Sequence, residues 1–112
     1  MEDFVTYDLA VKLKEKGFDW ETSNVYERNT IACRYEDYPK PTISQVLKWL
    51  REEKELHIEI YMYHNCYLWE IYNTKIYDAD FTQKSEKYSE IEYENYEQAS
   101  LAGIEYVIDN LI

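Results

Sequence analysis

The hydrophobic pattern of this chain changes its period at Leu56, and this change constrains the fold more than any other feature of the sequence. Residues 43–50 place apolar side chains at the i, i+3, i+4 and i+7 spacing of an amphipathic helix. Residues 56–62 alternate apolar and polar side chains, which is typical of a half-buried strand. Because the link at Glu55 is too short for a loop, we expect the helix and the strand to pack together at the centre of one core. Trp49 lies off the centre of the helix stripe, so we expect it to cover the edge of that core.

Capping residues predict where the second and third helices begin. Thr42 and Gln45 have the spacing of a capping box, in which both side chains satisfy amide groups that the first helical turn leaves unpaired. Asn95 and Gln98 repeat this spacing before the last helix. The apolar stripe of that helix ends at Leu111, close to the end of the chain.

The first helix is predicted between Thr6, which fits an N-cap, and Gly17, which fits the left-handed C′ position. Phe18 then occupies the C″ position. A Schellman motif usually brings that residue into apolar contact with position C3, which is Leu13 here. The sequence therefore predicts both ends of this helix.

Further strands are predicted after the central one. His64 and Asn65 offer a tight turn, and residues 66–72 have the composition of a returning strand. We expect a second turn at residues 73–75 and a third strand, at a sheet edge, over residues 76–81.

Two stretches have no clear pattern. Residues 25–35 are compatible with a hairpin or with a single strand at residues 31–35, and the sequence leaves both open. Residues 83–94 are polar and aperiodic, so we expect a mobile acidic loop there. Over residues 1–112 the elements predict a single compact α+β domain. It has about three helices on an antiparallel sheet of three to four strands, in the order α-β-α-β-β-β-α.

The charge of the chain is strongly negative, at 12 basic minus 23 acidic residues, or −11. Residues 1–56 contribute 9 minus 12, or −3, and residues 57–112 contribute 3 minus 11, or −8. Such a surface repels phosphate backbones, so we expect no direct binding of nucleic acid. It favours solubility and permits a basic protein partner.

The sequence has no apolar stretch of the kind found in secretory signals or membrane spans. We therefore expect a cytoplasmic protein, with no membrane contact, in which Cys33 and Cys66 are reduced thiols.

Residues for catalysis or metal binding are few. Cys33, Cys66, His57 and His64 are the only candidates for a nucleophile or a soft metal ligand, and their spacing fits no structural zinc motif. We expect two buried thiols and two surface imidazoles, with no catalytic, cofactor or metal site.

The outer face of the predicted sheet is the candidate interaction surface. If Ile58, Trp69 and Ile71 face the core, the intervening residues of the two strands share the opposite face. Tyrosine rings and carboxylates have the composition that interface hot spots favour. The alternative interpretation is a ladder of tyrosines that only stiffens the sheet, or a face that a helix covers. The candidate residues are His57, Glu59, Tyr61, Tyr63, Glu70 and Tyr72.

Four segments carry a resemblance to a known group of proteins. They are VTYDLAVKLKEKGF, PTISQVLKWLREEKELHIEIY, YLWEIYNTKIY and YENYEQASLAGIEYVIDNLI. Together they resemble a family of small uncharacterised proteins of Bacteroides-type gut bacteria and their phages or prophages. The resemblance implies a compact intracellular α+β domain that is often carried on mobile elements. It implies no activity and no catalytic or ligand-binding residues.

From these observations we expect a non-catalytic binding or adaptor protein of a phage or mobile element, which contacts a host or phage protein. One version of this hypothesis is acidic mimicry of nucleic acid. The alternative is a small-molecule binder with an aromatic pocket for a nucleotide-like signal, and an uncharacterised small enzyme ranks third. Self-association as a homodimer, through an edge strand or the aromatic face, is also left open.

Overall fold

The structure is a computed structural model that describes residues 3–22, 25–29, 35–77 and 83–112. It is an α+β fold with three helices, a three-stranded antiparallel sheet and a separate two-stranded hairpin, and its fold class agrees with the sequence prediction. The molecule is elongated, with extents of 57 × 31 × 24 Å. In chain order the elements are α1 (Tyr7–Glu15), β1 (Val25–Asn29), β2 (Tyr35–Pro39), α2 (Ile43–Glu53), β3 (Leu56–Tyr63), β4 (Cys66–Tyr77), β5 (Gln83–Tyr88) and α3 (Tyr96–Asn110).

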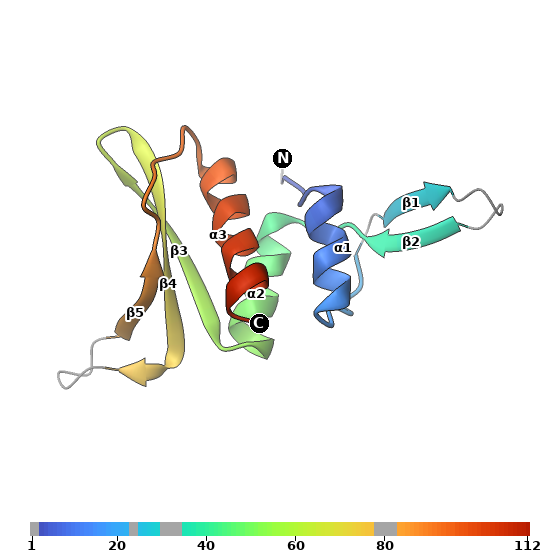
Figure 1. Cartoon of the computed structure of the whole chain (residues 1–112), viewed down its shortest axis with the longest axis horizontal. Helices are drawn as coiled ribbons and strands as arrows, with labels where there is room; N and C mark the ends of the chain where they lie inside the picture. The colour runs from blue at the N-terminus through green and yellow to red at the C-terminus, as the bar shows by residue number, and fades with distance from the viewer. Residues whose placement is uncertain (1–2, 23–24, 30–34, 78–82) are drawn as a thin grey trace.

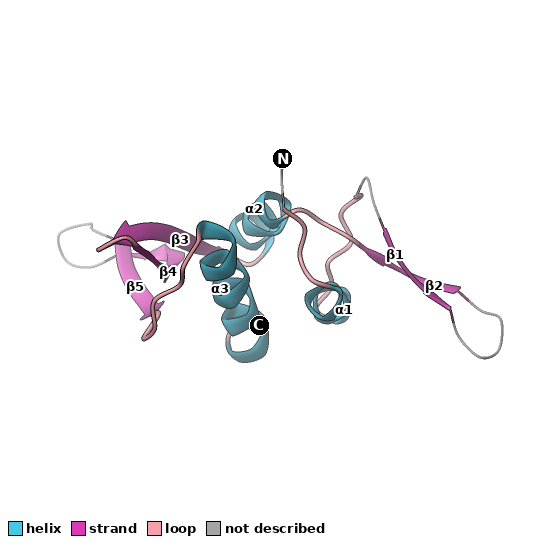
Figure 2. Cartoon of the chain, turned by 90° about the horizontal axis from the view of Figure 1, so that it is seen from above, coloured by secondary structure: helices cyan, strands magenta, loops and turns pink. Residues whose placement is uncertain are grey.

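The helices lie on one side of the β3–β4–β5 sheet. Figure 1 shows α3 and α2 next to the sheet, α1 beyond them, and the β1–β2 hairpin at the far end of the molecule. The view from above in Figure 2 agrees, because α2 and α3 again stand on a single side of the sheet. No helix or strand in the described part of the chain covers the other side.

The β3–β4 hairpin has the predicted turn and the predicted register. His64 and Asn65 both adopt positive φ angles, 51° and 65°, which the tight turn of a β-hairpin requires. Cross-strand pairs join Ile58 to Ile71 and Ile60 to Trp69, so these side chains share the face toward the helices. The alternate residues of both strands therefore share the opposite face.

Strand β4 is longer than predicted, and the turn expected at residues 73–75 is wrong. The strand continues because Asn73 pairs with Leu56, and the Thr74 amide donates to the Glu55 carbonyl at 2.8 Å. Glu55 itself has a φ of 59°, which redirects the chain between α2 and β3. The third strand predicted over residues 76–81 begins within β4, and its remainder lies outside the described residues.

The loop predicted over residues 83–94 is also wrong in part, because Gln83–Tyr88 forms the edge strand β5. Its pairing with β4 contains register shifts, which explains why its sequence shows no clean alternation. Around residues 25–35 the structure has a hairpin, but not with the expected bounds: residues 27–29, which a hairpin within that range would need for its turn, belong to β1, and the second strand is Tyr35–Pro39. The single strand alternative at residues 31–35 lies outside the described residues except for Tyr35, which begins β2.

The core forms where the sequence places it. Val46 and Leu50 of α2 are fully buried, and Ile58 of β3 belongs to the same apolar cluster. Trp49 is only 2% exposed, so it lies inside the core and not at its edge. The Phe18 ring contacts it edge-on, with ring centroids 5.3 Å apart, and this contact explains the deeper burial.

The predicted caps form, with one difference. The Thr42 hydroxyl accepts from the Gln45 amide at 3.1 Å, but the Gln45 side chain donates to the Glu21 carbonyl, so the capping box is half-formed. At the end of α1, Gly17 has a φ of 95° and the Phe18 amide donates to the Leu13 carbonyl at 2.9 Å. This is the predicted Schellman motif.

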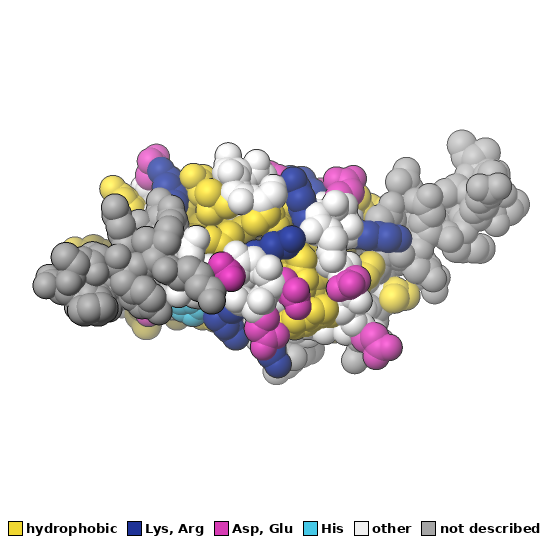
Figure 3. Space-filling view, turned by 90° about the horizontal axis from the view of Figure 1, so that it is seen from below, with side chains coloured by type: hydrophobic (Ala, Val, Ile, Leu, Met, Phe, Trp, Pro, Cys, Tyr) yellow, Lys and Arg dark blue, Asp and Glu magenta, His cyan; other side chains and the backbone are white. Residues whose placement is uncertain are grey.

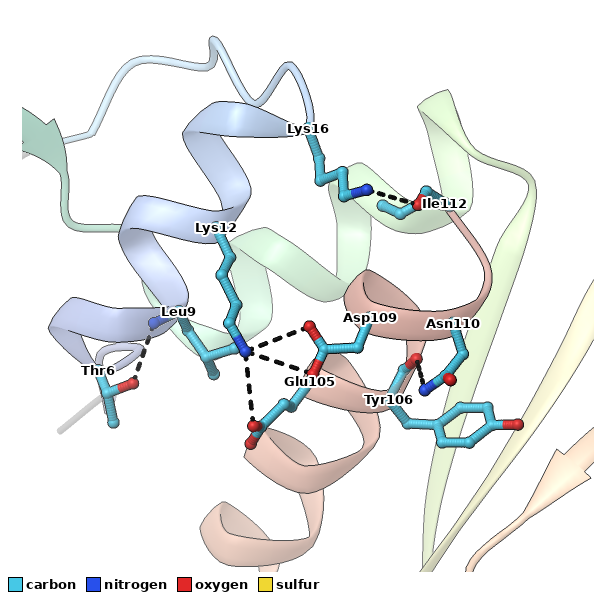
Figure 4. Close-up of polar contacts among 9 residues, drawn as sticks. All are labelled: Thr6, Leu9, Lys12, Lys16, Glu105, Tyr106, Asp109, Asn110 and Ile112. Carbon is cyan, nitrogen blue, oxygen red and sulfur yellow. Dashed lines mark hydrogen bonds and ion pairs between the residues drawn. The ribbon is translucent and has the colours of Figure 1, made fainter.

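Polar contacts at the surface join α1 to α3, as Figure 4 shows. The Lys12 ammonium lies 3.2 Å from Asp109 and 3.7 Å from Glu105, and the hydrogen bond to Asp109 raises the pKa of Lys12. The Lys16 ammonium donates to the Ile112 carbonyl at 2.8 Å. These contacts tie the first helix to the end of the last one.

Candidate functional site

The six candidate residues lie together on the uncovered side of the sheet, and we call this surface the acidic tyrosine face. The register places His57 opposite Tyr72 and Glu59 opposite Glu70. The other two pairs on this side join Tyr61 to Leu68 and Tyr63 to Cys66. The acidic tyrosine face consists of His57, Glu59, Tyr61, Tyr63, Glu70 and Tyr72.

Two carboxylates face each other at the centre of this surface. Glu59 and Glu70 are directly opposed on adjacent antiparallel strands, where like charges destabilise the pairing. Neither side chain takes part in an ion pair with another residue in the part of the chain that the structure describes. The pair is therefore a site where a cation from outside would relieve repulsion.

Two tyrosines border the carboxylate pair. The Tyr72 hydroxyl donates to Glu70 Oε2 at 2.6 Å, and this hydrogen bond, with burial and the nearby negative charges, raises the pKa of Tyr72 to about 12. Burial raises the pKa of Tyr61 too, with further contributions from Glu70 and Glu59. Both phenols therefore stay neutral at pH 7 and serve as hydrogen-bond donors and flat apolar surfaces.

His57 extends the surface beside Tyr72. The two rings are stacked, with centroids 6.4 Å apart and an interplanar angle of 28°. The His57 side chain is half-buried, so the expectation of a surface imidazole is wrong for this residue. Its Nδ1 atom is buried and has no hydrogen-bond partner within the part of the chain that the structure describes.

Tyr63 lies at the margin of the acidic tyrosine face. Its side chain is 55% exposed, and its ring packs edge-on against His64 with centroids 4.2 Å apart. The sequence groups Tyr63 with the other tyrosines because it has the same strand parity. The structure places it next to the turn, where the hairpin ends.

Cys66, the cysteine within the described residues, has an environment that disfavours a nucleophilic role. Cys66 is partly exposed, contrary to the prediction of a buried thiol, and Cys33 lies outside the described residues. A hydrogen bond with Glu92, together with burial and the charges of Glu92 and Glu94, raises the pKa of Cys66. A catalytic cysteine needs a lowered pKa, so this environment suppresses thiolate chemistry. No group of three or more potential metal ligands occurs among the residues described.

A concave site that the sequence did not predict lies between β5 and α3, and we call it the aromatic cavity. Its volume is about 300 Å³, and four of its lining residues are aromatic. Two of these, Tyr88 and Tyr93, fall in the stretch that was predicted to be a loop, so no periodicity indicated that they converge. The lining residues are Trp69, Lys87, Tyr88, Glu90, Ile91, Tyr93 and Tyr106.

In the described ranges, none of the helices is long and apolar enough to cross a lipid bilayer. Comparisons of the chain with protein-family models, with curated proteins and with solved structures find no match. The acidic tyrosine face and the aromatic cavity are therefore interpreted from their own geometry and chemistry.

Proposed function

We propose that this chain is a non-catalytic binding protein whose acidic tyrosine face docks on a positively charged segment of a partner protein. The observation that carries this proposal is the Glu59–Glu70 pair, two opposed carboxylates without a described ion pair on the uncovered side of the sheet. A partner's cation placed between them converts a repulsion into two attractions. The free energy of binding then includes the loss of the repulsion between Glu59 and Glu70 that is present in the free protein.

The rings around the pair suit arginine better than lysine. A guanidinium group is planar, binds carboxylates through two parallel hydrogen bonds and stacks on aromatic faces. Tyr61 and Tyr72 border the two carboxylates on the same surface, and tyrosine is enriched in interface hot spots. We therefore infer that the partner presents at least one arginine to this face.

The distribution of charge favours a local docking face over mimicry of nucleic acid. A mimic needs a continuous run of carboxylates. Figure 3 shows Lys and Arg side chains interspersed with Asp and Glu side chains over the face that it displays. The opposed pair of Glu59 and Glu70 is by contrast a single, defined site.

The setting of this function follows from the resemblance to phage and mobile-element proteins. On that basis, we propose that the partner is a host or phage protein in the cytoplasm. Nucleic acid is a poor partner for a chain with a net charge of −11.

Affinity capture from a bacterial lysate tests the proposal through a difference between variants. Glu59→Gln/Glu70→Gln removes the two opposed charges. Glu52→Gln/Glu53→Gln removes two exposed charges from α2 and is the matched control. We expect a protein retained by the wild-type chain and the control to be lost with the first variant. Equal retention by all three chains contradicts docking through the acidic tyrosine face.

The second candidate function, small-molecule binding, is favoured by one observation. The small-molecule hypothesis needs a concave aromatic site, and a nucleotide-like ligand is best bound where a Lys or Arg lies beside the tyrosines. The aromatic cavity has this composition, because Lys87 lines it together with three tyrosines.

A further inference from the structure

Most of the aromatic cavity lies on the helix side of the sheet. Trp69 faces the helices, and Lys87 shares that side because it pairs with Ile71. Tyr88 is the exception, since it pairs with Glu70 and so borders the acidic tyrosine face at the β5 edge. The cavity takes its walls from β4, β5, the segment before α3, and α3 itself.

Trp69 is the most buried part of the cavity wall. Its side chain is 5% exposed, and its ring lies against Tyr106 with centroids 5.2 Å apart and a tilt of 35°. The absence of a side chain at Gly103 lets α3 pack closely on the base of the Trp69 side chain. A Cβ built at Gly103 would lie only 3.3 Å from Trp69 Cγ. The indole is thus held between α3 and the cavity, with Tyr106 as its neighbour on the cavity side.

The indole N–H of Trp69 has no hydrogen-bond acceptor within the described residues, although the atom is buried. Leaving a buried donor without an acceptor costs about 1–3 kcal/mol. Buried indole N–H groups usually find a partner. An acceptor atom on a bound molecule would satisfy this donor if the Tyr106 ring, which lies against the indole and is itself only partly buried, turned aside.

The charges at the cavity select against ions. Lys87 is the only basic residue in its lining, and its ammonium is already paired with Glu90 at 3.2 Å. An added anion must therefore compete with Glu90 and approach a chain of net charge −11. The aromatic walls favour a flat ring, since rings stack on them with little loss of conformational freedom.

From these contacts we infer that the aromatic cavity binds an uncharged, planar heteroaromatic molecule whose acceptor atom takes the hydrogen bond of Trp69 Nε1–H. A volume of about 300 Å³ is at the small end of ligand sites, so a single ring system fits and a large cofactor does not. The inference develops the second candidate function and does not depend on docking through the acidic tyrosine face.

Adenosine is a suitable probe, because it is uncharged and its adenine ring is planar and rich in acceptor nitrogens. The measurement is an NMR titration that follows the indole N–H signals of the three tryptophans, with the Trp69 signal assigned by its absence from Trp69→Phe. We expect the Trp69 signal to shift and to saturate. Adenosine 5′-monophosphate, the charged counterpart, should bind roughly tenfold more weakly, because a surface potential of a few kT acts on its phosphate. Equal binding of both contradicts the selection for an uncharged ring.

Two exposed apolar residues provide the variant and its control. Ile91 lines the cavity and is 62% exposed, while Val25 lies outside it and is 48% exposed, so neither change to serine should unfold the protein. Ile91→Ser should weaken adenosine binding several-fold, and Val25→Ser should leave it unchanged. A Trp69 signal that stays fixed up to the solubility limit of adenosine overturns the inference. An equal response of the two variants overturns it as well. Glu59→Gln removes a charge of the docking surface from β3, which is not adjacent to β5, and should not alter this titration, so the outcome is separate from that of the docking proposal.

Discussion

Glu59 and Glu70 oppose each other across the β3–β4 pair, although like charges in this position weaken a sheet. We predict that Glu59→Gln stabilises the free protein by a few tenths of a kcal/mol, because it removes the repulsion and keeps the shape of the side chain. Urea unfolding midpoints measure the change. Glu70→Gln should stabilise less, because it also weakens the hydrogen bond from the Tyr72 hydroxyl. A lower midpoint for Glu59→Gln than for the wild type contradicts this account of the pair.

Tyr72 should ionise only at a pH well above the usual tyrosine range. The pKa of Tyr72 is raised from its usual value near 10 to about 12, because its hydroxyl donates to Glu70. A folded-state pKa above the unfolded one stabilises the fold below about pH 10, and this contribution is lost as the pH rises toward 12. Ultraviolet titration of phenolate should show a late step that is absent from Tyr72→Phe. Identical titration curves for the two proteins would exclude this role of Glu70.

Replacing either glycine with alanine should destabilise the protein, but for a different physical reason in each case. Gly103→Ala gains helix propensity of up to about 1 kcal/mol, but the new methyl group would lie 3.1 Å from Ile58 Cγ2 and push α3 off the sheet. We expect a net loss of about 1 kcal/mol, as in other overpacked cores. Gly17→Ala meets no neighbour within 4 Å, so its cost should come only from the positive φ of 95°.

Denaturant unfolding combined with NMR distinguishes the two glycine effects. Gly103→Ala should shift the indole signal of Trp69, whose Cγ lies against Gly103, and Gly17→Ala should not. If Gly103→Ala were more stable than the wild type, α3 would not pack as closely on the sheet as the structure shows.

The contact between α1 and α3 should depend on salt. Lys12→Met removes the pairs with Asp109 and Glu105, so we expect faster amide exchange in α1 and a smaller effect of added salt on that exchange. Lys48→Met, an exposed lysine of α2, is the control for loss of charge alone. The pKa of Lys12 is raised, so this contribution is complete below the ordinary lysine pKa and is lost at higher pH. Equal amide exchange of α1 in Lys12→Met and Lys48→Met would show that the ion pairs of Lys12 do not stabilise this contact.

The sequence predicts which residues share a side of the β3–β4 pair, because side chains alternate along a strand. Once Ile58 and Trp69 are assigned to the core, the alternation of the strands places Glu59, Glu70 and Tyr72 on the other side. No further information is needed, because a one-residue slip would expose the whole apolar set.

The aromatic cavity could not be predicted in the same way. Trp69 and Tyr106 are far apart in the chain, and their contact depends on how α3 crosses the sheet. Tyr88 belongs to an edge strand whose register shifts erase the period-2 pattern. The turn wrongly expected at residues 73–75 has a related cause, since Asn73 and Thr74 have turn propensity but find partners on the neighbouring segment.

The most direct test of the docking proposal is an NMR titration of the labelled chain with a short arginine-rich peptide. We predict that the amide shifts concentrate on β3 and β4 around Glu59 and Glu70. They should be largely lost in Glu59→Gln/Glu70→Gln and retained in Glu52→Gln/Glu53→Gln. Shifts spread over all acidic residues, or lost equally in both variants, would contradict the claim that these two carboxylates form the binding site.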